Sequence, residues 1–244
     1  MRPDLVLLLS LLALCFGSMA LFGLRYDQSS VDPLESKQRG TFVLGGFVRS
    51  WFLWFIGPAV GLALKAGLSP LFFNLAGATL GAAAGVAFGL GMPVLGGWFV
   101  FLGGIADVFD GRVARSQGIA SPKGAFLDSS LDRFAEVGMF AGLAVYFYQR
   151  PLVSMMVALA LGGSLLVSYT RARGESQGVT CKKGVMQRAE RLLLVGFGGL
   201  LDPSFSDWTG QAPGTLLALL VTVIAVGTIA TAIYRTVWIA ARLP

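Results

Sequence analysis

Long apolar runs recur along this chain, and most of them approach the length needed to cross a lipid bilayer. They cover residues 5–24, 71–90, 93–108, 124–148, 152–169, 192–201 and 215–239. A membrane helix needs about 20 apolar residues, and inside a bilayer the backbone must satisfy its hydrogen bonds within a helix or a closed barrel. The lengths of these runs predict an all-α integral membrane protein.

Composition agrees with this interpretation. Of the 244 residues, 55% are hydrophobic and 13% are charged, about half of the ~25% charged share that soluble domains have. The net charge is +6, but the cations lie in short loops between apolar runs, which favours membrane orientation over nucleic-acid binding. The chain has no histidine, which excludes Ser-His-Asp triads and most zinc sites. Cys15 and Cys181 have unrelated surroundings, so we interpret them as free thiols.

The first 46 residues are predicted to form a segment of their own. For residues 5–24 a cleaved signal peptide is the alternative to a retained helix, because Arg2 precedes the run and small residues end it. The length of the run and the cations that follow it, beginning with Arg25, favour a retained helix. We therefore expect a hydrophobic helix and linker in residues 1–46 and a membrane domain in residues 47–244.

Residues 47–68 mix aromatic and cationic side chains with apolar ones, as is typical of a helix lying at the membrane surface. A membrane span is the alternative for this segment. The six apolar stretches after it predict a core of six transmembrane helices, of which the fifth, residues 192–201, is short unless its helix begins near Val185. Glycines recur every four residues across residues 77–89, which predicts a stripe for close helix contact.

Loop charges predict the orientation of the core. The link after the second core stretch holds Arg112, Arg115 and Lys123, and the link after the fourth holds five cations. The intervening links carry few or none. Because positively charged loops face the cytoplasm, we expect both basic links there, and an even number of spans returns the C-terminus to the same side.

Four aspartates interrupt the apolar pattern where the second core stretch ends and the third begins. Residues three and four apart share one face of a helix, so Asp107 and Asp110 lie together at the end of one helix. Asp128 and Asp132 lie together at the start of the next. Two antiparallel helices joined by a short loop bring these faces together, so the sequence predicts four carboxylates converging near the cytoplasmic membrane surface.

Such a cluster needs a counter-charge. Two like charges ~4 Å apart repel by ~4 kcal/mol at an effective dielectric of ~20, and ionisable groups at membrane depth are costly and usually functional. Protonation, salt bridges to arginines and divalent cations are the alternatives. Oxygen ligands without His or Cys favour Mg²⁺ or Mn²⁺, and four acids have the capacity for two ions, an arrangement that orients phosphoryl groups.

The residues between the acids point to a phosphate ligand. Gly111 and Ala114 leave room for a ligand against the helix backbone, and Arg115 supplies a forked donor suited to phosphate. Together with the acids they predict a metal-bound site for a phosphate ester. On these residues alone, a cation pathway or a set of aspartate–arginine salt bridges is the alternative.

The whole spacing, from Asp107 to Asp132, is D-x2-D-G-x2-A-R-x8-G-x3-D-x3-D. It resembles the signature of the CDP-alcohol phosphotransferases, integral membrane enzymes of phospholipid synthesis. The resemblance extends from about Phe47 to Arg242, and residues 1–46 fall outside it. It implies a six-helix membrane core preceded by a surface helix, assembled as a homodimer.

The resemblance also implies roles for the motif residues. The CMP part of CDP-diacylglycerol is expected to lie against Asp107, Gly111, Ala114, Arg115 and Gly124. Asp107, Asp110 and Asp128 are implied as metal ligands, and Asp132 as a residue near the metal and the general base. That base takes the proton of the acceptor hydroxyl, which attacks the β-phosphorus and expels CMP.

A second basic region resembles the equivalent segment of phosphatidylinositol-phosphate synthases, which transfer to inositol phosphate. The residues that fit its pattern Y-x-K-A-R-A-E are Tyr169, Ala172, Arg173 and Glu175, and those that fit E-R-P-E-R-L are Arg188, Glu190, Arg191 and Leu192. Arg171, Gln187 and Ala189 are departures. By this resemblance the acceptor phosphate contacts Arg171, Arg191 and Arg235, with Arg173 and Arg188 near. The alternative is that these cations anchor the protein or bind lipid head groups.

The sequence thus predicts a metal-dependent transferase of the cell membrane whose active site faces the cytoplasm. Its expected partners are CDP-diacylglycerol, a small phosphorylated polyol and the bilayer, and not nucleic acid. Inositol phosphate is the expected acceptor, and glycerol 3-phosphate or another alcohol is the alternative. A cation transporter is the alternative outside enzymes, although transport predicts acids near the bilayer midplane on several helices.

Overall fold

The computed structural model describes residues 3–25 and 45–244, and every regular element in these residues is an α-helix. The helices fall into two compact units, Met1–Gly67 and Leu68–Pro244, which are described separately. The all-α class predicted from the apolar runs is confirmed.

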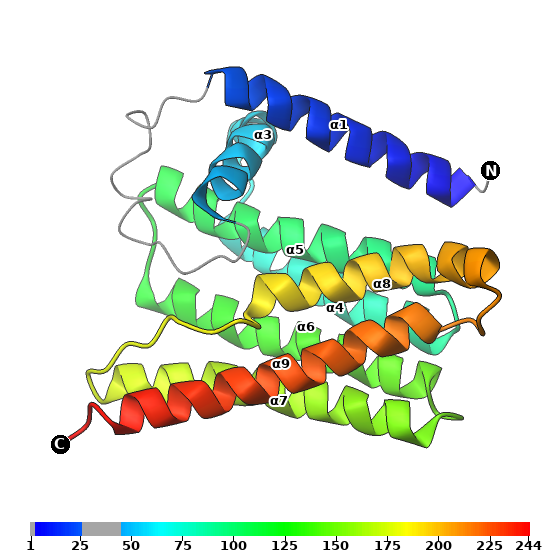
Figure 1. Cartoon of the computed structure of the whole chain (residues 1–244). Helices are drawn as coiled ribbons and strands as arrows, with labels where there is room; N and C mark the ends of the chain where they lie inside the picture. The colour runs from blue at the N-terminus through cyan, green and yellow to red at the C-terminus, as the bar shows by residue number, and fades with distance from the viewer. Residues whose placement is uncertain (1–2, 26–44) are drawn as a thin grey trace. The chain divides into compact units, whose positions relative to one another are not determined.

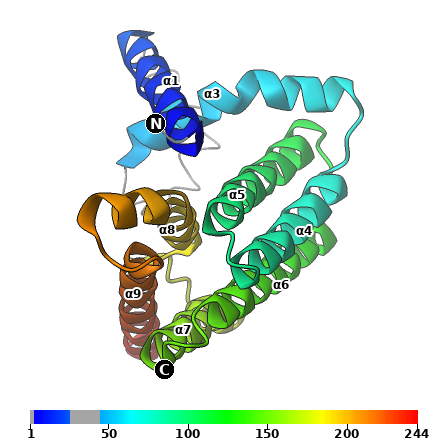
Figure 2. The ribbon, with the colours of Figure 1, turned by 90° about the vertical axis from the view of Figure 1, so that its right-hand side faces the viewer.

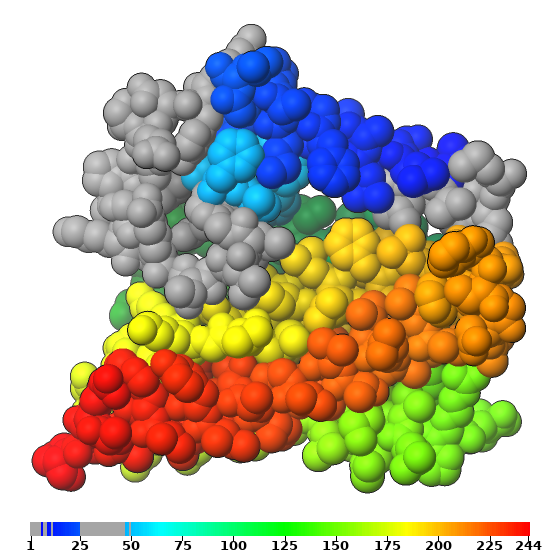
Figure 3. All heavy atoms as spheres, in the orientation of Figure 1, coloured from blue at the N-terminus to red at the C-terminus, as the bar shows by residue number. Residues whose placement is uncertain are grey.

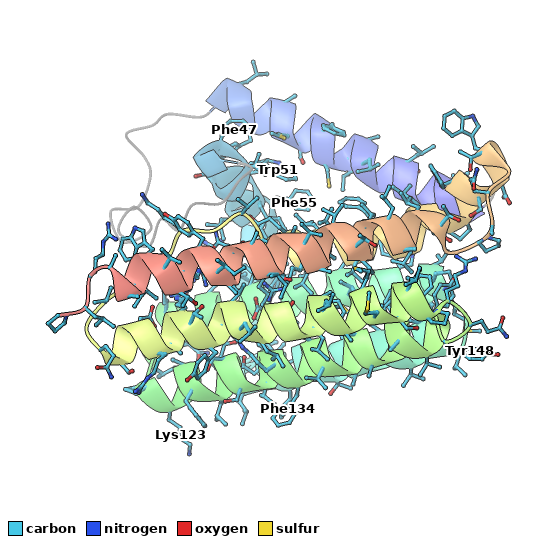
Figure 4. All side chains as sticks on the ribbon, turned by 60° about the horizontal axis from the view of Figure 1, so that its bottom comes forward. Phe47, Trp51, Phe55, Lys123, Phe134 and Tyr148 are labelled. Carbon is cyan, nitrogen blue, oxygen red and sulfur yellow. The ribbon has the colours of Figure 1, made fainter. Side chains whose placement is uncertain are left out.

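The first unit contains helices α1 (Pro3–Arg25) and α3 (Gly45–Lys65). Aromatic rings join them, because the Phe22 ring lies 5.6 Å from that of Phe47 and 5.5 Å from that of Trp54. The Trp51 indole also donates a hydrogen bond to Ser18 Oγ at 3.2 Å, and Figure 4 labels Phe47 and Trp51 on α3. Both segments that the sequence predicts as helices are helical, while the membrane placement of each stays a prediction.

The second unit contains six helices. They are α4 (Pro70–Gly89), α5 (Pro93–Ser116), α6 (Pro122–Tyr146), α7 (Pro151–Ser176), α8 (Arg188–Thr209) and α9 (Thr215–Ala240). Each packs against two others, in the order α5, α4, α6, α7, α9, α8 and back to α5, so that the six form a closed ring (Figures 1 and 2). This ring gives side chains on α5, α6 and α8 a common interior.

Helix starts follow from local sequence. Four of the six helices begin at a proline, at positions 70, 93, 122 and 151, where the missing N–H costs nothing and the fixed φ suits the first turn. Ser69 and Ser121 precede two of them, and each hydroxyl accepts a backbone N–H of the first turn at 3.2 Å. Serine caps and N1 prolines therefore set where α4 and α6 begin.

Helices α4, α5, α7 and α9 are long and apolar enough to cross a membrane. Helices α6 and α8 carry more charged residues, several of them buried inside the ring, such as Glu136 and Arg191. On the outside of α6, Phe134 is 71% exposed and projects away from the bundle, between Lys123 near one end of the helix and Tyr148 beyond the other (Figure 4). By length and composition these four helices agree with the predicted integral membrane class, and the count of six spans stays a prediction.

Helix α8 differs from its predicted extent. The short apolar stretch 192–201 is the middle of a 22-residue helix that continues through Pro203. Gly210 ends it in the left-handed conformation with φ 69°. The buried Asp202 accepts backbone N–H groups of Gly214 at 2.6 Å and Leu217 at 3.1 Å, which ties α8 to the start of α9. Figure 3 shows α8 and α9 along one face.

The glycine stripe of α4 serves two neighbours. Gly77 faces α5, where an added Cβ would lie 3.5 Å from the Gly103 carbonyl oxygen. Gly85 faces α6, where an added Cβ would collide with the Gly138 carbonyl, and a Cβ on Gly142 would in turn collide with Gly85. The predicted close contact is therefore real, and it brings α5 and α6, which carry the aspartates, against the same helix.

Candidate active site

Three of the four aspartates converge inside the ring. One carboxylate oxygen from each of Asp107, Asp110 and Asp128 lies within 4.8 Å of the others. Asp110 is buried at 5% exposure, and its carboxylate also accepts the backbone N–H of Gly111. The helix ends of α5 and α6 thus meet at one point.

The fourth aspartate is joined to this group by an arginine. Arg188, at the first residue of α8, contacts Asp107 Oδ1 at 2.6 Å and Asp132 Oδ1 at 2.7 Å. Arg133 lies 3.5 Å from the other Asp132 oxygen. Among the described residues Asp132 is not part of the three-carboxylate group, so its role as general base or metal ligand stays a prediction.

Asn74, on the second turn of α4, is a site residue that the sequence reasoning missed. Its side-chain amide lies against Asp110 and Asp128, and with the NH₂ group turned toward them it donates to both, at 3.1 Å for Asp128 Oδ1. The orientation of an amide is assigned from such a network. The sequence feature that could have indicated it is the position of this amide within the otherwise apolar run 71–90.

The small residues of the motif shape the surroundings of the acids. A Cβ on Gly111 would lie 3.1 Å from the Arg115 guanidinium, so the glycine allows this exposed arginine to fold back over the helix. Ala114 is half-buried beside it. Gly124 donates its N–H to the Ser121 cap at 3.2 Å, which places it at the entry of α6. The nucleotide-binding role predicted for these residues stays a prediction.

Arg191, predicted to bind the acceptor, is 1% exposed and paired with Glu136, which is equally buried. Arg191 Nε donates to Glu136 Oε1 at 3.0 Å, and Nη1 donates to the Met186 carbonyl at 3.4 Å. The sequence reasoning also missed Glu136. Its signal was the spacing of four residues from Asp132, which places both acids on one face of α6.

Three of the other predicted acceptor residues lie toward the ends of α7 and α9. Arg235 is 3% exposed and donates to the backbone carbonyls of Lys183 at 2.9 Å and Val167 at 2.8 Å. Arg171 is exposed and pairs with Glu175 at 2.9 Å, and Arg173 is exposed on the same helix end. Of the five predicted arginines, the structure joins Arg188 directly to the aspartates.

The donor set fits a divalent cation. Three carboxylates from two helices present oxygens to one point, with half-buried or buried side chains and with no histidine in the chain. Hard oxygen ligands of this kind suit Mg²⁺ or Mn²⁺ better than softer metals. Asp107, Asp110 and Asp128 are the residues that would hold the ion.

A family model described as CDP-alcohol phosphatidyltransferase matches residues 68–243, nearly the whole second unit. The chain belongs to this family. It is therefore an integral membrane transferase, and the predicted family and enzyme class are confirmed. The match begins at Leu68, the first residue of the second unit, and the predicted domain boundary at residues 46 and 47 stays a prediction.

Curated relatives share this membership. The phosphatidylinositol phosphate synthase of Streptomyces avermitilis is 34% identical over 223 residues, covering 84% of this chain and 88% of the relative. The archaetidylinositol phosphate synthase of Methanothermobacter thermautotrophicus is 33% identical over 166 residues, covering 68% of this chain and 82% of the relative.

Solved structures of similar fold exist for the phosphatidylinositol phosphate synthase of Mycobacterium tuberculosis. The structure with CDP-DAG bound has a TM-score of 0.66 and 26% identity, covering 75% of this chain and 92% of that one. The complex with manganese and citrate has the same TM-score and identity and covers 87% of that chain. This transferase thus shares its fold with an enzyme crystallised with a nucleotide lipid and with a divalent metal.

Proposed function

We propose that this transferase moves the phosphatidyl group of CDP-diacylglycerol to inositol phosphate, giving phosphatidylinositol phosphate and CMP. The observation that carries the proposal is the group of three carboxylates on α5 and α6 with Arg188 of α8 against it. Relatives 34% and 35% identical to the chain, from Streptomyces avermitilis and Mycolicibacterium smegmatis, are named phosphatidylinositol phosphate synthases. A solved relative contains CDP-DAG.

Three of the aspartates bind metal in this proposal. Asp107, Asp110 and Asp128 hold one or two Mg²⁺ or Mn²⁺ ions. When bound, such ions neutralise charge on the diphosphate and orient its oxygens. Asn74 donates to the Asp110 and Asp128 carboxylates when its NH₂ group is turned toward them, and it would fix their orientation when a metal is bound, because partners of metal ligands fix ligand orientation.

Asp132 accepts the proton in the transfer step. The acceptor hydroxyl oxygen forms a bond to the β-phosphorus, the bond between that phosphorus and the CMP oxygen breaks, and the hydroxyl proton passes to an Asp132 oxygen. Arg188 orients the Asp132 carboxylate through its contact at 2.7 Å. A carboxylate serves as general base when it lies within hydrogen-bond reach of the proton that it takes.

Basic side chains are available to bind both anionic substrates in this proposal. Arg115 lies over Gly111 beside the acids, where its fork suits the diphosphate of the nucleotide lipid. Arg171, Arg173 and Arg188 flank the same end of the ring on α7 and α8, where an anionic acceptor is attracted. We place this end at the cytoplasmic face, because both basic links lie there, and we expect the protein to act as a homodimer.

A CMP-release assay with the purified protein, CDP-diacylglycerol and Mn²⁺ or Mg²⁺ tests the proposal. Inositol phosphate, glycerol 3-phosphate and free inositol are compared as acceptors. We expect the highest kcat/KM with inositol phosphate and loss of activity after metal chelation. A higher kcat/KM with glycerol 3-phosphate or with free inositol would overturn the choice of acceptor and leave the family reaction in place.

Three sequence positions favour a different phosphorylated acceptor within the same enzyme family. Arg171, Gln187 and Ala189 depart from the pattern of the inositol-phosphate branch. Arg171 is cationic like the lysine it replaces, but it pairs with Glu175 at 2.9 Å. Another phosphorylated polyol is therefore the second candidate, and the same panel of acceptors distinguishes it.

A further inference from the structure

A ladder of two ion pairs crosses the interior of the ring between α6 and α8. Asp132 and Glu136 lie one turn apart on α6, and Arg188 and Arg191 lie one turn apart on α8. Asp132 pairs with Arg188, and Glu136 pairs with Arg191. The helices that pack most closely on α8 are α5 and α9, so long charged side chains span the distance from α8 to α6.

The second rung is fully enclosed. Glu136 and Arg191 are each 1% exposed, so this ion pair is buried inside the ring, and the predicted contact of Arg191 with the acceptor stays a prediction. Arg191 donates hydrogen bonds from its Nε and one Nη to a single oxygen, Glu136 Oε1. The rung therefore fixes the position of the first turn of α8 and offers no open binding surface itself.

The two rungs share a small cavity. Glu136 and Arg188 both line it, together with Gly77, Gly81, Gly103 and Leu192, and its volume is about 20 Å³, which is room for about one water molecule. Glu136 Oε2 and Arg188 Nε are buried and have no hydrogen-bond partner among the described residues. One Glu136 oxygen therefore pairs with Arg191. The other has no partner among the described residues, and Glu136 shares the cavity with Arg188.

We propose that Glu136 is a positioning residue for the acceptor side of the site, holding Arg191 and, across the cavity, Arg188 in register with the aspartates. The inference rests on the proposed transfer to a phosphorylated acceptor. Arg188 is the basic side chain that touches both Asp107 and the predicted base Asp132. Loss of the Glu136 charge leaves Arg191 buried without its counter-charge, so that the first turn of α8, which begins at Arg188, shifts.

The consequence is selective for the acceptor. The nucleotide lipid is expected to lie on the α5 side, against Asp107, Gly111 and Arg115, whereas the acceptor is expected to approach from the basic ends of α7 and α8. Arg188 also contacts Asp107, but Asp107 is held in the three-carboxylate group by α5 and α6. We therefore expect a change in the register of α8 to weaken acceptor binding more than donor binding. A KM effect confined to one substrate reports lost binding of that substrate.

Glu136→Gln tests this, because the amide keeps the shape of the side chain and removes its charge. With the full-length protein in lipid vesicles, we expect the KM for inositol phosphate to rise about tenfold while the KM for CDP-diacylglycerol changes less than about twofold. Titration calorimetry with inositol phosphate should show the same rise in Kd. Glu136→Asp, which restores the charge, should recover most of the loss.

Two further variants separate positioning from stability. Asp202→Asn removes the charge of another buried carboxylate, at the opposite end of α8, and weakens its hydrogen bonds to the start of α9. It should therefore lower Tm while leaving the ratio of the acceptor KM to the donor KM unchanged. The double variant Glu136→Leu, Arg191→Met replaces the pair by apolar side chains of similar size, which often restores stability. We expect this variant to recover Tm without recovering the acceptor KM.

The outcomes are distinct. Equal rises in both KM values for Glu136→Gln, or recovery of the acceptor KM in the apolar double variant, would overturn the positioning role. If the wild-type protein prefers glycerol 3-phosphate, the proposed acceptor fails, and the same variants are then measured with that phosphorylated acceptor. If Glu136→Gln does not fold, the apolar double variant decides through its acceptor KM.

Discussion

Arg188 joins two carboxylates for which the sequence predicts different roles. It contacts Asp107, a predicted metal ligand, and Asp132, the predicted base, at 2.6 and 2.7 Å. Two acids held by one guanidinium keep a fixed separation, because the fork of an arginine has fixed geometry. Individual side chains therefore set both the charge balance and the spacing of the site.

Asp132→Asn should lower the rate of CMP release by at least about a hundredfold, because an amide cannot accept the proton that a general base removes. The asparagine oxygen can still accept from Arg188, so the fold and Mn²⁺ binding should persist. Thermal unfolding and Mn²⁺ titration check these two properties. Asp207→Asn, an exposed acid near the far end of α8, is the control, and retention of most of the rate by Asp132→Asn would disprove the assignment.

Asn74→Ala should weaken Mn²⁺ binding by about tenfold, since removal of a partner that orients metal ligands typically has this effect. Electron paramagnetic resonance of free Mn²⁺ measures the affinity without any substrate. Thr79→Ala is the matched control on the same helix, because its hydroxyl donates to the Leu75 carbonyl of α4 itself. Wild-type affinity in Asn74→Ala would show that the amide does not position the carboxylates.

Contacts between helices depend on glycines that allow backbones to touch. Helices α4 and α6 approach closely at Gly85 and Gly142. A Cβ on Gly85 would collide with the backbone of α6 at Gly138, and a Cβ on Gly142 would collide with the backbone of α4 at Gly85. Membrane helices pack through such small residues because lipid gives them little hydrophobic reason to associate. The position of the Asp128 end of α6 relative to α5 follows from this contact with α4.

Gly142→Ala should therefore destabilise the protein by about 1–3 kcal/mol, the usual cost of overpacking, and reduce metal affinity through displacement of α6. A fluorescence-based thermal unfolding assay in detergent measures the change. Gly162→Ala on α7 is the control, because an added Cβ there meets nothing within 4 Å. Equal Tm values for the two variants would contradict the importance of the α4–α6 contact.

The chain as a whole divides into a ring that carries the candidate site and an N-terminal unit. All the predicted site residues lie in Leu68–Pro244, and the family model matches residues 68–243. Helix α3 belongs to the first unit, whereas the sequence assigns its residues to the membrane domain. The contribution of each N-terminal segment is therefore open to direct test.

Removal of residues 1–46 should leave CMP release within about twofold of the full-length rate, because the predicted transferase domain begins at residue 47 and every predicted catalytic contact lies beyond it. The assay compares both proteins in vesicles at equal amounts of folded protein. A variant lacking the same residues but also carrying Asp132→Asn gives the background. A large loss of activity in the first variant would place the N-terminal segment within the functional domain.

Features that depend on spacing along one helix could be predicted from the sequence. The apolar runs predicted the helices, and spacings of three and four placed Asp107 beside Asp110 and Asp128 beside Asp132, because the period of an α-helix determines which residues share a face. The family motif added the expected roles. The serine caps and N1 prolines of α4 and α6 are local signals of the same kind, although the apolar runs alone were used to predict these helices.

Only the tertiary structure decided which faces meet. The partnership of Asn74 with Asp110 and Asp128, and that of Glu136 with Arg191, joins different helices. The continuation of α8 through Pro203 likewise depends on its packing and on the end at Gly210. Helix rotation and closeness of approach are set by the packing of all six helices together, through contacts distant in sequence, so no local pattern could determine them.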